Sequence, residues 1–166
     1  MGTRRSAFFI TCTFIVTTIV VIGFAGKSYA ACSQDNVSVR GDFGLAQFTV
    51  EVADSIAERS RGLMFVEDMA TTQGMLFVYE WPQNVSFWMR NTLIPLDIIF
   101  VDDIGIIRNI HSMALPLDET SIFGGSDIQF VLEINGGLAN RLGMDVGDQM
   151  QHISFGRGAV WPCDAN

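Results

Sequence analysis

Polar residues interrupt an otherwise apolar stretch between Ser86 and Phe100. If residues 86–91 form a strand, Trp88 and Arg90 project from the same face, because alternate side chains of a strand share a face. An aromatic ring beside a planar cation suits a sugar, a carboxylated ligand or the side chains of a partner protein. A second interpretation stays open, in which Trp88 belongs to the core and Arg90 covers it.

Two carboxylates near this stretch lie in apolar surroundings. Asn91 and Thr92 are expected to form a bend, Asp97 follows at the start of the next strand, and Glu133 lies inside another apolar run. A glycosidase needs two carboxylates that face each other across a cleft and differ in pKa. Alternatively, Asp97 and Glu133 accept hydrogen bonds from the backbone or from arginine and stabilise the fold.

Other catalytic and metal-binding patterns are missing from the sequence. His111 and His152 are the two histidines, and there is no G-x-S-x-G, C-x-x-C, H-x-x-x-H or glycine-rich phosphate loop. We therefore assign no catalytic residue, metal or cofactor. The seven methionines after residue 30 leave copper handling as an alternative, because thioethers bind Cu(I). Methionine also fills gaps in cores.

The elements that must position these residues are mostly short strands. Residues 46–53 alternate polar and apolar side chains, as a half-buried strand does. Residues 96–102 and 104–115 are expected to form a hairpin. Further strands are expected at 74–80, 86–91, 127–135 and 148–155, a turn at 81–85, and short helices at 54–65 and 136–143. The pattern predicts one mainly β (α+β) domain over residues 46–155, a small β-sandwich, jelly roll or barrel with one or two short helices.

The chain begins with a segment typical of a signal peptide. Two arginines precede a long apolar run, and small residues at Ser28 and Ala30 favour cleavage before Ala31. The predicted signal peptide spans residues 1–30, with an uncleaved membrane anchor as the alternative. The segment carries three of the ten basic residues and none of the eighteen acidic ones, so its removal takes the formal net charge from −8 to about −11. Such a surface disfavours nucleic acid as a partner. A periplasmic or extracellular location is expected.

Two cysteines remain after the signal peptide. In an oxidising compartment, Cys32 and Cys163 are expected to form a disulfide that joins the chain ends. The alternative is a lipoprotein site with lipid on Cys32, which excludes the disulfide. A membrane is expected as a partner only through this lipid or an uncleaved signal. Residues 31–45 are expected to form a polar tether, and residues 156–166 a C-terminal tail.

Five ordered blocks make the chain resemble a known family. They are S-R-G-L-M-F (60–65), G-M-L-F-V-Y (74–79), F-W-M-R-N-T-L-I-P-L-D-I-I-F-V-D (87–102), V-L-E-I-N-G-G (131–137) and G-M-D-V-G-D (143–148). Together they resemble the DUF192 family, also called UPF0127, over residues 46–155. The resemblance implies a compact, mainly β fold that often follows a signal sequence. It implies no activity, because the family is uncharacterised.

The preferred interpretation is an exported domain that binds a small molecule, such as a sugar or small anion, or a partner protein. The expected helix would bring Arg61 toward the strands. The hypothesised site consists of Arg61, Trp88, Arg90, Asn91, Thr92, Asp97 and Glu133. One alternative is a hydrolase that uses Asp97 and Glu133, and another is a copper-handling protein. A third is a structural or interaction protein in which Arg61 and Trp88 are buried. The sequence leaves the oligomeric state open.

Overall fold

The computed structural model describes residue 2 and residues 32–163. The predicted signal peptide, residues 1–30, lies outside the described residues apart from Gly2. Within this described part of the chain, no helix combines the length and the apolar character needed to span a bilayer.

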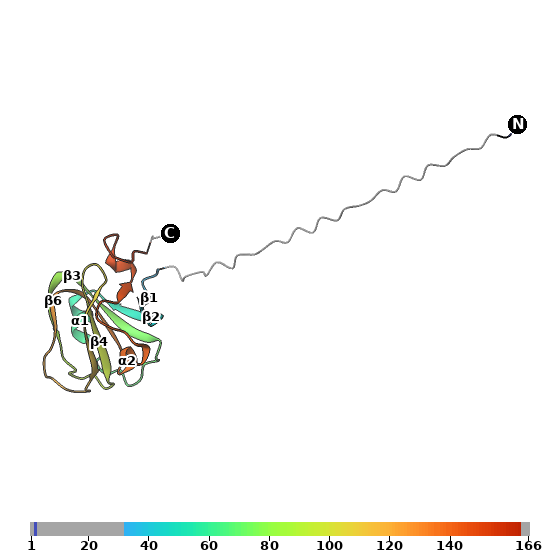
Figure 1. Cartoon of the computed structure of the whole chain (residues 1–166). Helices are drawn as coiled ribbons and strands as arrows, with labels where there is room; N and C mark the ends of the chain where they lie inside the picture. The colour runs from blue at the N-terminus through green and yellow to red at the C-terminus, as the bar shows by residue number, and fades with distance from the viewer. Residues whose placement is uncertain (1, 3–31, 164–166) are drawn as a thin grey trace.

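A single curled sheet of seven strands forms the described domain (Figure 1). Two short α-helices and one 3-10 helix accompany it, which confirms the expected mainly β fold. In space the strands follow the order β5-β4-β6-β3-β2-β1-β7. The elements are β1 (Asn36–Gly41), β2 (Gly44–Ala53), α1 (Ile56–Arg61), β3 (Gln73–Phe87), β4 (Leu96–Val101), β5 (Ile107–Ala114), β6 (Ile122–Asn135), α2 (Leu138–Leu142), β7 (Gln149–Gln151) and the 3-10 helix η1 (Ile153–Phe155).

The sheet curls until its two end strands approach each other. Ile106, just before β5, forms an antiparallel bridge with Gln149 of β7. The backbone N–H of Ile107 donates to the carbonyl of Asp148 at 2.9 Å. These contacts join one corner of the sheet, so the strands form a half-barrel rather than the two layers of a sandwich.

Each face of the curled sheet carries its own apolar cluster. The inner core gathers side chains from all seven strands, among them Val37, Ile99 and Leu132. The outer core contains residues of β2 to β6, together with Leu63 and Met89 from the segments that follow α1 and β3. Successive strand residues face opposite sides, so the central strands contribute to both cores. The segments after α1 and β3 cover the outer face.

Strand β3 is longer than the sequence predicts. The turn expected at residues 81–85 is an irregular part of one strand, which pairs with β6 through several register shifts. The pairing of β3 with β2 ends at Phe77, so Pro82 lies where one side of the strand has no neighbour in the sheet. Proline is tolerated at such an edge because it has no N–H to donate. The strand expected at 86–91 ends at Phe87, which places Trp88 and Arg90 in the following segment.

The tether expected at residues 31–45 is wrong over Asn36–Gly41. This stretch forms β1, which pairs with β2 on one side and β7 on the other. Val37 and Val39 are fully buried in the inner core. The alternation of valine with polar residues is a strand pattern, and its short length among polar residues concealed it.

The C-terminal segment also packs on the domain, beside β1 in Figure 1. Cys163 forms the predicted disulfide with Cys32, so the sulfur of Cys32 is not available for lipid. The N–H of Val160 donates to the carbonyl of Ile104 at 2.9 Å, and Ala159 is buried. Residues 156–163 are therefore attached to the domain instead of forming a free tail.

Candidate ligand-binding site

A cavity of about 320 Å³ lies where α1, β3 and residues 88–92 meet. We call it the Trp88 cavity. Its walls include Leu63 and Phe77 of the outer core, which places it on the outer face of the sheet. Five of the seven residues in the hypothesised site line it, namely Arg61, Trp88, Arg90, Thr92 and Glu133.

Helix α1 delivers Arg61 to the rim of this cavity. A capping box starts the helix: the hydroxyl of Ser55 accepts from the N–H of Glu58, and the Glu58 carboxylate accepts from the N–H of Ser55. The Ser55 hydroxyl also donates to the Glu58 carboxylate, and this hydrogen bond, together with the one from the Ser55 N–H, holds the pKa of Glu58 below its usual value. Gly62 ends the helix with a φ of 48°, a conformation that favours glycine. The short helix therefore ends with Arg61 beside the cavity.

Arg61 is exposed, and its guanidinium has no hydrogen-bond or ion-pair partner among the described residues. The structural-protein alternative requires Arg61 and Trp88 to be buried. The structure contradicts that requirement, because Trp88 is also 47% exposed.

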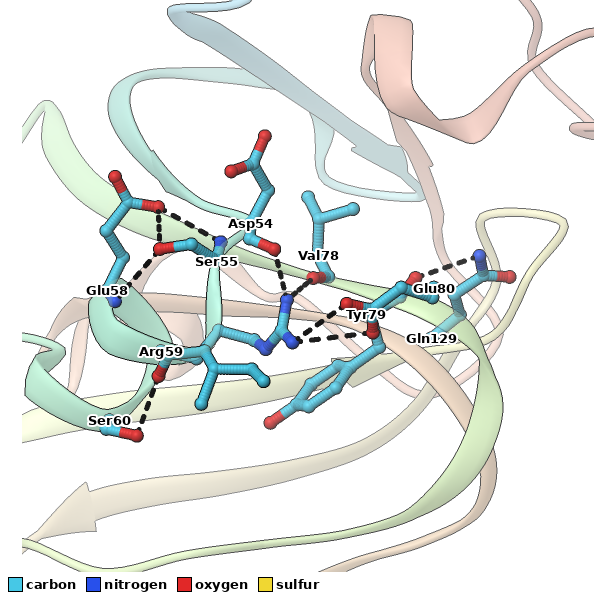
Figure 2. Close-up of polar contacts among 10 residues, drawn as sticks. Asp54, Ser55, Glu58, Arg59, Ser60, Val78, Tyr79, Glu80 and Gln129 are labelled. Atoms are coloured by element: carbon cyan, nitrogen blue, oxygen red, sulfur yellow. Dashed lines mark hydrogen bonds and ion pairs between the residues drawn. The ribbon is translucent and has the colours of Figure 1, made fainter.

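Arg59, two residues earlier, holds α1 against β3 and was not identified from the sequence. Its guanidinium donates to the carbonyls of Asp54 and Val78, the latter at 2.7 Å, and pairs with Glu80 at 3.1 Å (Figure 2). It also lies 5.1 Å from the centre of the Tyr79 ring. The charge of Arg59 is therefore already matched. Because Arg59 and Glu80 are far apart in sequence, no local pattern indicates this pair.

Trp88 and Arg90 form one wall of the cavity. The Arg90 guanidinium lies 5.5 Å from the centre of the Trp88 ring, within the range of a cation–π contact. Its one ion-pair partner in the described chain is Glu119, at 3.9 Å, and both side chains are exposed. The sequence correctly brings Trp88 and Arg90 together, although through an irregular segment and not through a strand face.

Strained backbone fixes the segment that carries this wall. Asn91 has a φ of 56°, and its carbonyl accepts from the N–H of Phe65, whose φ is 66°. The carbonyl of the buried Thr92 accepts from the N–H of Leu117, whose φ is 63°. Non-glycine residues adopt this left-handed conformation rarely, and such residues cluster at functional sites. Asn91 does not line the cavity, so its role is to shape the bend.

Glu133 contributes a buried carboxyl group to the cavity. It lies on β6, and its cross-strand partners are Met75 of β3 and Ile98 of β4, both in the outer core. Only 4% of Glu133 is exposed, and no other described residue donates a hydrogen bond to its carboxyl group. Burial raises the pKa of Glu133 to about 8. The carboxyl group is therefore mostly protonated at neutral pH.

Asp97 lies on the opposite face of the sheet from Glu133. It is the neighbour of Ile98, the residue directly paired with Glu133, so its side chain enters the inner core. Its carboxylate accepts from the backbone N–H groups of Met113, Gly137 and Ala139 at 2.7–2.8 Å. Asp97 therefore stabilises the fold and does not belong to the site. The hydrolase hypothesis is wrong in its choice of residues, because Asp97 and Glu133 cannot face each other.

The copper-handling alternative gains no local support. Met75, Met89, Met144 and Met150 are buried in the two cores, where they fill space between apolar side chains. Met64 is the one methionine that lines the cavity in the described chain. The residues described here also include no cluster of three or more His, Cys, Asp or Glu side chains able to hold a metal ion.

Sequence comparison now identifies the family. A family model named DUF192 and described as "Uncharacterized ACR" matches residues 37–152. The chain belongs to the DUF192 family. This match includes β1, which the blocks found in the sequence did not reach.

Two solved structures are similar to this chain in sequence and fold. A protein of unknown function from Novosphingobium aromaticivorans DSM 12444 is 45% identical, with a TM-score of 0.68 over 69% of this chain and 82% of the other. A proposed transcription regulator from Sinorhizobium meliloti 1021 is 36% identical, with a TM-score of 0.69 over 74% of this chain and 95% of the other. No curated protein shows significant similarity to this DUF192 chain.

Proposed function

We propose that this DUF192 protein binds a small polar molecule in the Trp88 cavity. One observation carries the proposal: a buried carboxyl group without a partner in the described chain shares a cavity with a free arginine. Polar groups in folded proteins are nearly always hydrogen-bonded, to protein or to water. The carboxyl group of Glu133 has no partner in the described chain and opens onto the cavity, so it is suited to a partner that the chain itself does not supply.

The other walls suit the same role. The Trp88 ring offers a flat, half-exposed surface for stacking, and Arg61 offers a planar cation for charge-assisted hydrogen bonds. The cavity volume of about 320 Å³ is near the lower end of the usual range for small-molecule sites, about 300–1,000 Å³. A compact ligand fits better than an extended chain.

Binding is favoured over hydrolysis and over nucleic-acid recognition. Among the residues that the structure describes, Glu133 is the one acidic residue that lines the cavity, whereas a glycosidase mechanism needs two carboxylates. The proposed mature protein carries a formal net charge of about −11, which opposes binding to phosphate backbones. The regulator name of the Sinorhizobium protein is therefore not extended to this chain.

We further propose that the protein works outside the cytoplasm. The basic, apolar and small-residue pattern of residues 1–30 supports export. The disulfide between Cys32 and Cys163 is compatible with it, because disulfides persist in oxidising compartments.

The binding proposal is tested by calorimetric titration of the disulfide-bonded protein with a panel of monosaccharides and small carboxylates. At least one compound is expected to bind, and Trp88→Ala is expected to weaken it about tenfold, the scale of one lost aromatic contact of about 1.4 kcal/mol. Trp81→Ala is the matched control, because Trp81 is exposed and lies outside the cavity. No binding by any compound, or equal losses in the two variants, would overturn the proposal.

A further inference from the structure

The Trp88 cavity has two polar parts of different character. Glu133 is buried, and burial raises the pKa of its carboxyl group, whereas Arg61 and Arg90 are exposed. One part is therefore a buried, neutral carboxyl group, and the other consists of exposed cations. A ligand that satisfies both parts needs two different polar groups.

Resting on the binding function proposed above, we infer that the ligand is an acidic sugar. By this we mean a single ring that carries several hydroxyl groups and one carboxylate. The carboxylate pairs with Arg61, the ring stacks on Trp88, and a ring hydroxyl bonds to Glu133.

The charge of the cavity supports the carboxylate. Arg61 has no acidic partner in the described chain, and Arg90 has only a distant, solvent-exposed one in Glu119. Arg59 is already neutralised by Glu80. With Glu133 protonated, the cavity is a cationic spot on a chain whose net charge is −8. An arginine fork matches the geometry of a carboxylate, which it can bind through two hydrogen bonds.

The neutral carboxyl group supports hydroxyl groups. A protonated carboxyl group both donates and accepts hydrogen bonds, and so does a sugar hydroxyl. The hydroxyl-bearing residues Ser86 and Thr92 also line the cavity. An ammonium group, as in an amino acid, would need Glu133 to be ionised. Burial of Glu133 among apolar side chains disfavours that form.

Titrations at pH 6.5 with four probes test the inference: D-glucuronate, D-galacturonate, D-glucose and glycine. One of the two uronates is expected to bind at least tenfold more tightly than glucose, and glycine is expected not to bind. Arg61→Ala should bring the affinity for the uronate to within about threefold of the affinity for glucose, and the affinity for glucose should stay the same. Arg141→Ala is the matched control, because Arg141 is exposed on α2 and lies outside the cavity.

A second pair of variants tests Glu133. Glu133→Gln keeps a neutral group that donates and accepts, so uronate affinity should change less than threefold. Glu133→Leu removes both functions and should weaken uronate and glucose alike by about tenfold. Circular dichroism and thermal melts establish that each variant is folded.

The outcomes separate this inference from the broader proposal. The inference of an acidic sugar is overturned if glucose binds as tightly as both uronates, or if glycine binds more tightly than either uronate. In both cases a small-ligand site remains. If Arg61→Ala weakens glucose as much as the uronate, the role given to Arg61 is overturned. If none of these probes and no member of the broader panel binds, both the inference and the proposed function fail.

Discussion

Glu133 is expected to make the stability of the protein fall as pH rises. Its pKa is about 8 in the folded state against a usual value of 4.5, so the folded state binds more protons between these values. The free energy of unfolding should therefore decrease by about 1.4 kcal/mol per pH unit across that window. Glu133→Gln cannot ionise, and it should abolish this decrease. Urea unfolding at pH 5, 7 and 9 measures it.

Other groups also titrate in this range, so the comparison between variants is the informative quantity. Burial lowers the pKa of His152, which makes its contribution to stability fall with decreasing pH below about 6.5, the opposite direction. Glu67→Gln is the matched control, because Glu67 is exposed. If the free energies of unfolding of wild type and Glu133→Gln differ by the same amount at pH 5 and at pH 9, the neutral buried carboxyl group is disproved.

The sequence predicted the members of the site better than their arrangement. Arg61, the pair of Trp88 and Arg90, and Glu133 come from three separate blocks, yet the structure places all four residues on one cavity. Asp97 was assigned to the wrong role because its direction depends on the register between β4 and β6. The sequence shows that Asp97 and Glu133 each lie in an apolar strand, but it does not show which residues pair across the two strands.

Asp97 joins three elements, and its loss should weaken the fold without disturbing the cavity. Its carboxylate on β4 accepts hydrogen bonds from Met113 of β5, from Gly137, the N-cap of α2, and from Ala139 within α2. Asp97→Asn turns one oxygen into an amide that faces N–H donors. The free energy of unfolding should fall by about 3 kcal/mol, the scale of losing hydrogen bonds to a buried charge. Denaturant unfolding measures it.

Asp103→Asn is the control for this change, because Asp103 lies exposed in the β4–β5 turn and should tolerate the substitution. Under conditions where both variants are folded, each should bind the ligands of the Trp88 cavity as the wild type does. Equal stability of the two variants would disprove the structural role of Asp97. A selective loss of binding in Asp97→Asn would return Asp97 to the functional site.

Elements with a clear local pattern were predicted well, and those that depend on neighbours were not. The β4–β5 hairpin and the helix closed by Gly143 follow from apolar runs and turn residues within each segment. Strand β3 continues through Pro82 because β2 has already ended at that level. Which side of a strand is unpaired is a property of the whole sheet, and no local pattern in residues 81–85 reveals it.

The two ends of the described chain hold each other in place. The Nδ1 atom of His152 accepts from the N–H of Ser154, so its Nε2–H is left to donate to the carbonyl of Gln34 at 2.9 Å. Strand β1 pairs with β7 nearby. The disulfide between Cys32 and Cys163 adds a covalent link between residues 131 positions apart. The described parts of the predicted tether and tail therefore pack together at one edge of the half-barrel.

Removing the disulfide should destabilise the whole molecule and leave the cavity intact. The double variant Cys32→Ser/Cys163→Ser loses a link that restrains a long loop of the unfolded chain, so the free energy of unfolding should fall by about 2–4 kcal/mol. The residues that line the Trp88 cavity run from Arg59 to Glu133 in the sequence, so none of them belongs to the chain ends that the disulfide links. Ligand affinity of the folded variant should therefore equal that of the wild type.

Reduced wild-type protein is the matched control, since it lacks the same bond without any substitution. It should unfold at the same urea concentration as the double variant, and both should unfold before the oxidised protein. Equal stability of the oxidised and reduced proteins would show that β1, β7 and His152 hold the ends without help. A loss of ligand affinity on reduction would mean instead that closure of the half-barrel shapes the cavity on its outer face, so that the chain ends and the site are coupled.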